Sequence, residues 1–144
     1  FTLPNQDGTS ITLSSFKGQR VIIYFYPKDD TPGCTKEACN FRDRWNFFED
    51  SGINIIGISK DEAKSHIKFI AKHKLPFTLL TDKDPCPVAI AYESYGLKKF
   101  MGREYMGMMR HTFVIGKDGK IELIYLKVKS AVMADQIIED LNLN

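Results

Sequence analysis

Two cysteines five residues apart, Cys34 and Cys39, are the residues of this sequence whose types and spacing most clearly point to chemistry. Cys34 follows an apolar β-type run, Val21–Tyr26, and then the turn residues Pro32 and Gly33, and it opens a helical pattern. The free N–H groups and the positive dipole end at a helix start favour an anion, so this position favours thiolate over thiol. The alternative is the usual fate of a free cysteine, a small buried side chain.

The helical pattern after Cys34 runs to about Ser51, where Gly52 stops it. Apolar residues recur at steps of three and four and form a core-facing stripe: Ala38, Phe41, Trp45 and Phe48. Cys34 lies on this stripe, whereas Cys39 points away from it. Residues five apart in a helix have Cα atoms about 8–9 Å apart, and a disulfide needs about 4.4–6.8 Å. A bond between the two cysteines therefore requires the first helical turns to unwind.

Length and composition narrow the class of protein. The 144 residues predict one domain, 1–144, large enough for its own hydrophobic core. A formal charge of +2, with acids interspersed among the bases, excludes a nucleic-acid surface, and no apolar run is long enough for a membrane span. Three cysteines, an odd number, favour a reduced compartment, and we expect a cytoplasmic, bacterial-type protein. The abrupt start suggests a trimmed or processed end, and a transit-peptide site there would make the location organellar.

The remaining elements alternate between strand and helix. The pattern predicts strands at 10–13, 53–59, 77–80, 112–115 and 121–125, and helices at 61–74, 84–95 and 130–141. In the 61–74 helix we expect Asp61 as N-cap, Ile67, Ile70 and Ala71 on the inner side, and solvated His66 and His73. Residues 96–108 are predicted as a loop. This order is typical of an α/β protein with a thioredoxin-like layer arrangement.

The residues around Cys34 carry a resemblance to a known family. Pro27-x-x-x-Thr31-x-x-Cys34 matches the active-site signature of peroxiredoxins, and the run from Tyr24 to Cys39 closely resembles the peroxiredoxin Q branch, also called bacterioferritin co-migratory protein. The likeness extends from Phe1 to about Leu141. It implies a thioredoxin-like fold with a central mixed sheet flanked by helices. It also implies a thiol peroxidase for hydrogen peroxide and alkyl hydroperoxides, with no cofactor and no metal.

The resemblance gives roles to the residues next to Cys34. Cys34 would attack the O–O bond of a peroxide as thiolate and become a sulfenic acid. Thr31 would point its hydroxyl at the thiolate and the peroxide; the alternative is a hydroxyl that caps the helix, and the two roles are compatible. The amides of Gly33 and Cys34 would hold the peroxide oxygens. Pro27 would shield the pocket from water.

Two charged residues extend this expected site. Arg110 stands where the family carries an active-site arginine, and a guanidinium beside Cys34 would stabilise the thiolate and bind peroxide oxygen. The alternative is a surface arginine at a strand start. Glu37, one turn after Cys34, either orients that arginine or complements the helix dipole.

The other thiols differ in what the resemblance assigns to them. Cys39 would resolve the Cys34 sulfenic acid as an intramolecular disulfide, which thioredoxin or a similar dithiol reduces, and the protein would be a monomer. The alternative is an idle, half-exposed cysteine. Cys86 receives no role from the family, and we expect a free cysteine in the first turn of a helix. A second resolving or regulatory thiol is the alternative.

Three other functions fit parts of the sequence less well. A disulfide oxidoreductase would have a C-x-x-C pair, whereas the spacing here is C-x4-C. A metal-binding module would need paired cysteine or histidine ligands, which the spacing does not supply. A non-enzymatic chaperone or interaction role is neither indicated nor excluded by the sequence. We therefore expect a thiol peroxidase.

Overall fold

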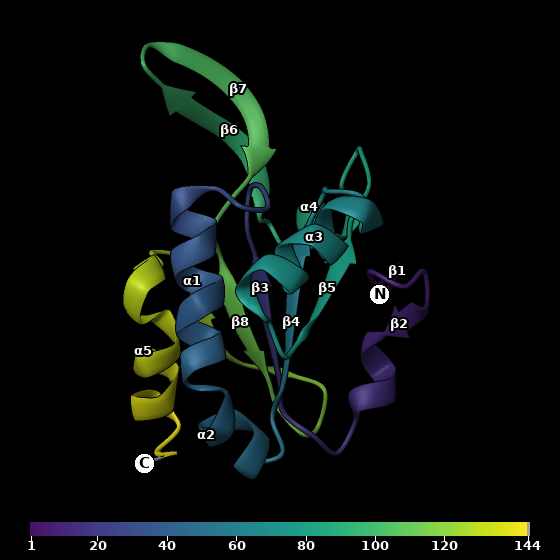
Figure 1. The fold of residues 1–144 in the computed structure, drawn as a ribbon, viewed down its shortest axis with the longest axis vertical. Helices are drawn as coiled ribbons and strands as arrows, with labels where there is room; N and C mark the ends of the chain where they lie inside the picture. The colour runs from purple at the N-terminus through teal and green to yellow at the C-terminus, as the bar shows by residue number, and fades with distance from the viewer. Residues whose placement is uncertain (144) are drawn as a thin grey trace.

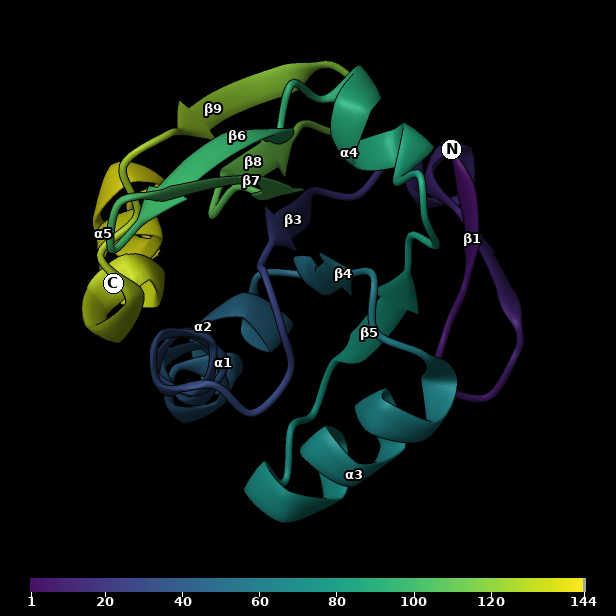
Figure 2. The ribbon, with the colours of Figure 1, turned by 90° about the horizontal axis from the view of Figure 1, so that it is seen from above.

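A five-stranded mixed sheet forms the centre of the computed structural model, which describes residues 1–143. The strand order is β5-β4-β3-β8-β9 (Figures 1 and 2). These strands are β3 (Val21–Phe25), β4 (Asn54–Ser59), β5 (Thr78–Thr81), β8 (Thr112–Ile115) and β9 (Ile121–Tyr125). The first three are parallel to one another, and β8 and β9 run antiparallel to their neighbours. The predicted central mixed sheet is confirmed.

Helices make the crossovers that parallel strands require. The helices are α1 (Pro32–Asp43), α2 (Trp45–Asp50), α3 (Ala63–His73), α4 (Pro87–Ala91) and α5 (Met133–Asp140). Two short 3-10 turns, η1 (Leu13–Phe16) and η2 (Ser130–Val132), complete them. The pair α1 and α2 connects β3 to β4, and α3 connects β4 to β5. In Figure 2, α1 and α5 lie side by side against the sheet, whereas α4 lies on the opposite side of it.

β3 is the central strand, and the alternation of its side chains creates two cores. All five of its residues are buried. Ile22 and Tyr24 join the cluster that contains Cys34 and Phe41, under α1 and α5. Ile23 and Phe25, two residues apart and so on the same side of the strand, join the second cluster on the other face. The strand that leads to Cys34 is therefore packed on both faces and gives the site a rigid base.

Several predictions for the helices were wrong in detail. The helix predicted to reach Ser51 is interrupted at Arg44, whose φ of −108° and ψ of 11° are not helical. In α3, the buried residues are His66 and Phe69, whereas Ile67 is 51% exposed. Ile70 packs against the core as predicted, but Ala71 is exposed like Ile67, and His66 is buried rather than solvated, because a fully partnered histidine can lie in a core that apolar spacing alone does not identify. Glu62, rather than Asp61, is the N-cap.

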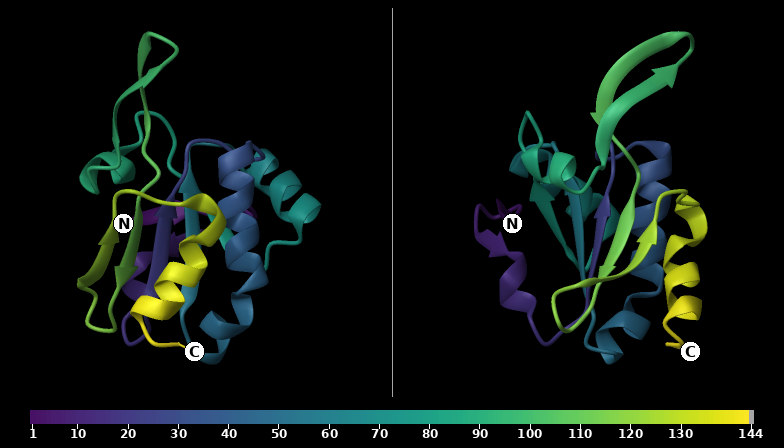
Figure 3. Two further views of the ribbon diagram at one scale, coloured as in Figure 1. Left: turned by 90° about the vertical axis from the view of Figure 1, so that its left-hand side faces the viewer. Right: turned by 180° about the vertical axis from the view of Figure 1, so that it is seen from behind.

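The segment predicted as a helix to residue 95 and then a loop is instead a short helix and a hairpin. After α4, β6 (Tyr95–Phe100) and β7 (Arg103–Met108) pair along their whole length. The turn between them has positive φ at both Met101 and Gly102, the geometry of a tight two-residue hairpin turn. This hairpin projects from the body at the end where α1 begins (Figures 1 and 3).

The chain begins with a second, smaller hairpin beside β5. Its strands are β1 (Thr2–Pro4) and β2 (Ser10–Thr12). A bridge between Asn5 and Leu80 joins this hairpin to the β5 edge of the main sheet. It lies away from the beginning of α1, so it supports the sheet rather than the site (Figure 2).

Candidate active site

The loop from β3 to α1 places Cys34 in the first turn of α1, as predicted. Thr31 is the N-cap residue, with extended φ and ψ of −96° and 157°, and Pro32 takes the first helical position. Proline is favoured there because its missing N–H would have no helical partner. Cys34 is only 1% exposed, so its sulfur lies in an enclosed place at the positive end of the helix.

Arg110 contacts Cys34 directly. Its Nη2 lies 3.4 Å from Cys34 Sγ, and its Nη1 donates to Glu37 Oε1 at 3.4 Å. Thr112 Oγ1 donates to the other oxygen of Glu37, also at 3.4 Å. Thr112 is the first residue of β8 and Arg110 lies two residues before it; β8 pairs antiparallel with β3, which brings both residues beside α1. Of the two roles expected for Glu37, the contact with Arg110 is present.

Burial governs the charges of this cluster. The Glu37 side chain is fully buried, and burial raises its pKa to about 7, although Arg110 and the hydrogen bond from Thr112 act in the opposite direction. Burial alone would lower the pKa of Arg110, but Cys34 and Glu37 outweigh it and raise that pKa. Arg110 therefore keeps a fixed positive charge against the sulfur at every physiological pH.

Gly33 is the residue that allows this approach. A Cβ at position 33 would lie 2.9 Å from Arg110 Nη2 and 3.4 Å from its Cζ. A side chain at position 33 would therefore displace the guanidinium from the first turn of α1. The first N–H groups of α1, including those of Gly33 and Cys34, point out of the helix end without intrahelical acceptors.

Thr31 and Pro27 lie in the loop that joins β3 to α1. Thr31 Oγ1 donates to the backbone oxygen of Lys28 at 2.8 Å and makes no side-chain cap hydrogen bond. Capping by this hydroxyl, one of the two expected roles, is therefore wrong, and the backbone oxygen of Thr31 accepts from Thr35 N instead. Because its proton is engaged by Lys28, the hydroxyl keeps its lone pairs free to accept. Pro27 is half-buried directly after β3.

Cys39 is half-buried in the second half of α1, and the three cysteines are all free. α1 is continuous from Pro32 to Asp43, so the two thiols are separated by more than a helical turn and cannot bond in this conformation. The end of α1 is tied to α5: Asn40 Oδ1 accepts from Ala134 N at 2.6 Å, and Asn40 Nδ2 donates to Asp135 at 2.9 Å.

Comparisons with known proteins agree with this geometry. Residues 1–124 match the model of the AhpC/TSA family. Peroxiredoxin Bcp of Bacillus subtilis is 47% identical over 127 residues, which cover 88% of this chain and 80% of the relative. Peroxiredoxin Bcp of Escherichia coli is 42% identical over 138 residues, or 96% of this chain and 88% of the relative.

A solved structure of the bacterioferritin comigratory protein of Xanthomonas campestris, described with its alkyl peroxide reduction activity, superposes with a TM-score of 0.91. It is 34% identical, and the match covers 99% of this chain and 90% of that one. The chain is a peroxiredoxin of the AhpC/TSA family. Its fold is thioredoxin-like, and it is a thiol-dependent peroxidase that acts on peroxides with a thiol reductant.

Cys86 and Lys98 are two further titratable residues of this peroxiredoxin, and only Cys86 was singled out from the sequence. Cys86 is free and fully buried at the N-cap of α4, and burial, followed by Asp82 and Asp84, raises its pKa to about 11. Lys98 on β6, which we did not predict, donates to the backbone oxygen of Met108 at 3.1 Å, and its pKa is lowered by burial and by the charge of Arg110, with Cys34 acting in the opposite direction. Its signal was hidden because residues 96–108 were predicted as a loop.

Among residues 1–143, no group of three or more His, Cys, Asp or Glu side chains is arranged to hold a metal ion. Within the same residues, no helix combines the length and apolar character needed to cross a bilayer.

Proposed function

We propose that this peroxiredoxin reduces hydrogen peroxide and alkyl hydroperoxides with Cys34 as the nucleophile. The observation that carries the proposal is the contact of Arg110 with Cys34 Sγ at the first turn of α1. The thiolate attacks the terminal oxygen of the peroxide, an S–O bond forms and the O–O bond breaks. The products are the Cys34 sulfenic acid and a hydroxide or alkoxide, which takes a proton from solvent to leave as water or alcohol.

The surrounding groups fit the demands of this step. Charge develops on the leaving oxygen, where Arg110 and the amides of Gly33 and Cys34 supply fixed donors. The free lone pairs of Thr31 Oγ1 suit it to accept from the peroxide O–H. Glu37 holds Arg110 on the side away from the sulfur, and half-buried Pro27 limits the access of water.

Cys39 is proposed as the resolving thiol. Its thiolate attacks the sulfur of the Cys34 sulfenic acid, so that an S–S bond forms, the S–O bond breaks and hydroxide leaves, which takes a proton from solvent to become water. The first turns of α1 must unwind for this, and the side-chain contacts in those turns are those of Arg110 with Cys34 and of Arg110 and Thr112 with Glu37. The anchors of Asn40 on α5 keep Cys39 in place meanwhile.

The cellular setting is proposed from the thiol chemistry. A disulfide within one chain needs no partner subunit, so we infer a monomer with a single domain, 1–144. Thioredoxin or a similar dithiol is the proposed reductant, because it returns an exposed disulfide to two thiols. Three free cysteines fit a reducing compartment, and with bacterial relatives this favours the cytoplasm.

The test combines two variants with a disulfide map. Cys34→Ser is expected to abolish the consumption of hydrogen peroxide. Cys39→Ser is expected to consume one equivalent and then stop with a sulfenic acid at Cys34, which a sulfenic-acid probe detects by mass spectrometry. After one equivalent of peroxide, non-reducing peptide mapping of the unaltered protein should show a Cys34–Cys39 bond.

Each result has a contrary outcome. Peroxide consumption that persists in Cys34→Ser would remove Cys34 as the nucleophile. Unchanged thioredoxin-coupled turnover in Cys39→Ser would remove Cys39 as the resolving thiol and leave the first step intact.

A further inference from the structure

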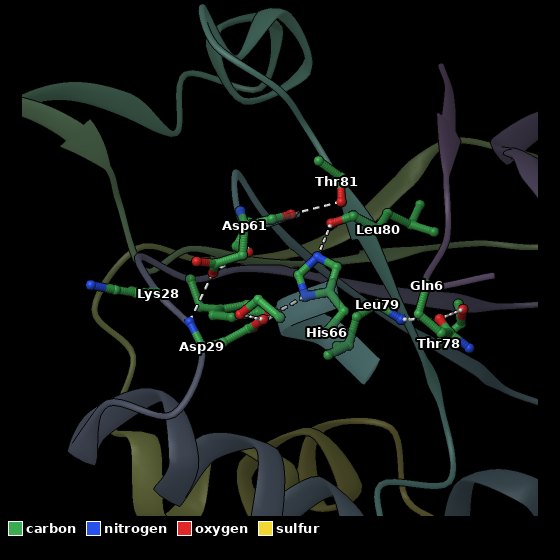
Figure 4. Close-up of polar contacts among 12 residues, drawn as sticks. Gln6, Lys28, Asp29, Asp61, His66, Thr78, Leu79, Leu80 and Thr81 are labelled. Carbon is green, nitrogen blue, oxygen red and sulfur yellow. Dashed lines mark hydrogen bonds and ion pairs between the residues drawn. The ribbon is translucent and has the colours of Figure 1, made fainter. Parts of the chain in front are cut away.

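His66 is a fully buried histidine that takes no part in the chemistry described above, and both of its ring nitrogens are engaged (Figure 4). Nε2 lies 3.1 Å from the backbone oxygen of Leu80 and Nδ1 lies 2.7 Å from Asp29 Oδ2. A carbonyl oxygen and a carboxylate oxygen both only accept, so each ring nitrogen donates in this arrangement. The other contact joins α3 to the loop between β3 and α1, five residues before Cys34.

Asp29 is the point at which this loop is fastened. The side chain of Asp29 is 4% exposed, and besides His66 it accepts from Tyr26 Oη at 2.6 Å and from Ser65 Oγ at 2.8 Å. Its backbone N–H donates to Asp61 Oδ2 at 2.8 Å, as Figure 4 shows. A carboxylate buried among three donors cannot move without leaving them unpaired, which makes this part of the loop rigid.

The next residue, Asp30, shows why such a clamp is needed. Its φ is 57°, in the left-handed region that costs a non-glycine residue free energy. Lys72 Nζ and His73 Nε2, also from α3, contact its two carboxylate oxygens at 2.7 and 3.1 Å. Hydrogen bonds from these two residues lower the pKa of Asp30. α3 therefore holds Asp29 and Asp30, two consecutive residues. The strained backbone at Asp30 directly precedes Thr31, the N-cap of α1, and so sets where α1 begins.

The two ends of the Cys34 segment are held by different elements. On the loop side, His66 of α3 contacts Asp29. At Cys34 itself, the contact comes from Arg110, just before β8. If the first turns of α1 unwind, the contact with Arg110 is lost but the contacts of Asp29 need not change. The loop would then be the fixed point from which α1 forms again.

We propose that His66 is a positioning residue of the peroxidase site: through Asp29 it fixes the 27–31 loop so that Cys34 meets Arg110 and the peroxide in register. The proposal rests on the proposed role of Cys34 and adds a residue that acts through another. His66 then affects the rate at which Cys34 reacts with peroxide and leaves the rate of the later disulfide formation with Cys39 unchanged.

Two substitutions of His66 separate its two hydrogen bonds. An asparagine amide reaches the place of Nδ1, so His66→Asn can keep a donor to Asp29 and loses the bond to Leu80. A glutamine amide reaches the place of Nε2, so His66→Gln can keep the bond to Leu80 and loses the bond to Asp29. Each variant removes one buried hydrogen bond, and because the bond to the Asp29 carboxylate is the stronger of the two, His66→Gln should lose somewhat more thermal stability than His66→Asn.

The measured quantity is the rate constant for consumption of one equivalent of hydrogen peroxide, in a Cys39→Ser background that isolates the first step. We expect His66→Gln to lower it about tenfold, the size of one hydrogen bond to a charged group, and His66→Asn to stay within about twofold. Disulfide formation after the first step, followed in the background with Cys39, should not slow. Lys68→Ala, an exposed change on the same helix, should change neither rate.

The contrary results are equally definite. An unaltered first-step rate in His66→Gln, or equal losses in both His66 variants that track their stability, would overturn the positioning role. If both variants fold poorly, Ser65→Ala decides, since it removes one donor from the same carboxylate: a first step slowed about threefold supports the proposal and an unchanged one overturns it. Loss of peroxide consumption in Cys34→Ser tests the proposed function separately, so the two failures are distinguishable.

Discussion

The guanidinium of Arg110 contacts the sulfur of Cys34 at 3.4 Å, although the two residues are 76 positions apart. The contact depends on the antiparallel pairing of β8 with β3, which brings the start of β8 to the end of β3 from which the chain enters α1. It also depends on the absence of a side chain at Gly33, where a Cβ would lie 2.9 Å from Nη2. The position of one charge therefore depends on both a strand pairing and a glycine.

Gly33→Ala tests this dependence. The added methyl group should push Arg110 away from Cys34 and slow the reaction with peroxide by at least about tenfold, since a preorganised charge is then misplaced. The fold should not suffer, because alanine is favoured over glycine in a helix by up to about 1 kcal/mol. Stopped-flow peroxide consumption and thermal unfolding measure the two effects. Thr35→Ala in the same helical turn is the control, and a Gly33→Ala enzyme as fast as this control would contradict the prediction.

Glu37 predicts a specific pH dependence of stability. Its pKa is raised from 4.5 to about 7 by burial, so the folded chain binds this proton more tightly than the unfolded chain does. The resulting stabilisation is fully present below pH 4.5 and is lost as the pH rises through about 7. Relative to Glu37→Gln, which cannot titrate, the unaltered protein should lose up to about 3 kcal/mol of unfolding free energy across that range.

Urea unfolding of the unaltered protein and of Glu37→Gln, both with reduced cysteines, from pH 4.5 to pH 8 measures the difference in their unfolding free energies. The contributions of the other titrating groups are the same in both proteins and cancel in this difference. Parallel stability curves for the two proteins would show that Glu37 does not titrate in this window.

The sequence predicted the strand, the turn and the helix start around Cys34 because each has a local signal: a β-type run, Pro32 with Gly33, and a 3.6-residue apolar period. Arg110 has no local signal, and only the family resemblance indicated it. His66 was predicted to be solvated because the spacing of Ile67 and Ala71 pointed to another face of α3, whereas burial of a histidine depends on partners from Asp29 and β5. Partners that are distant in sequence leave no periodicity.

The β6–β7 hairpin was missed for a different reason. Its strands are mostly exposed and do not alternate between apolar and polar residues in the way that a half-buried strand does. Its turn, Met101-Gly102, lacks the Asn-Gly or Asp-Gly pair that most clearly signals a two-residue hairpin. Lys98 was missed because its strand was missed.

Cys86 should be chemically silent. It is fully buried, and with a pKa of about 11 it is a thiol at neutral pH and a poor nucleophile. Cys86→Ala is expected to keep turnover within about twofold and to cost about 1 kcal/mol of stability through lost packing. Thioredoxin-coupled peroxide consumption and urea unfolding measure these, with Cys39→Ser as the variant that should lose turnover. A Cys34–Cys86 peptide in the non-reducing map would give Cys86 the resolving role instead.

Tyr24 and Tyr26 form a matched pair for the cost of a buried hydroxyl. Within residues 1–143, the Tyr24 hydroxyl is buried without a hydrogen-bond partner, and its ring stacks on Phe41 at 5.0 Å between ring centroids. Burial, with Glu37 and Cys34 nearby, raises the pKa of Tyr24, so the hydroxyl stays protonated. Tyr24→Phe keeps the ring and removes only the unpaired group, and it should raise the unfolding free energy by about 1 kcal/mol.

Tyr26 is the control because its hydroxyl donates to Asp29 Oδ1 at 2.6 Å. Tyr26→Phe should lower the unfolding free energy by about 1–2 kcal/mol, since it leaves a buried carboxylate with one donor fewer. Urea unfolding of the two variants under identical conditions compares one hydroxyl with a partner and one without. A Tyr24→Phe protein destabilised as much as Tyr26→Phe would mean that the Tyr24 hydroxyl is satisfied in solution, and a water bound between it and the Cys34 pocket would then be the group to look for.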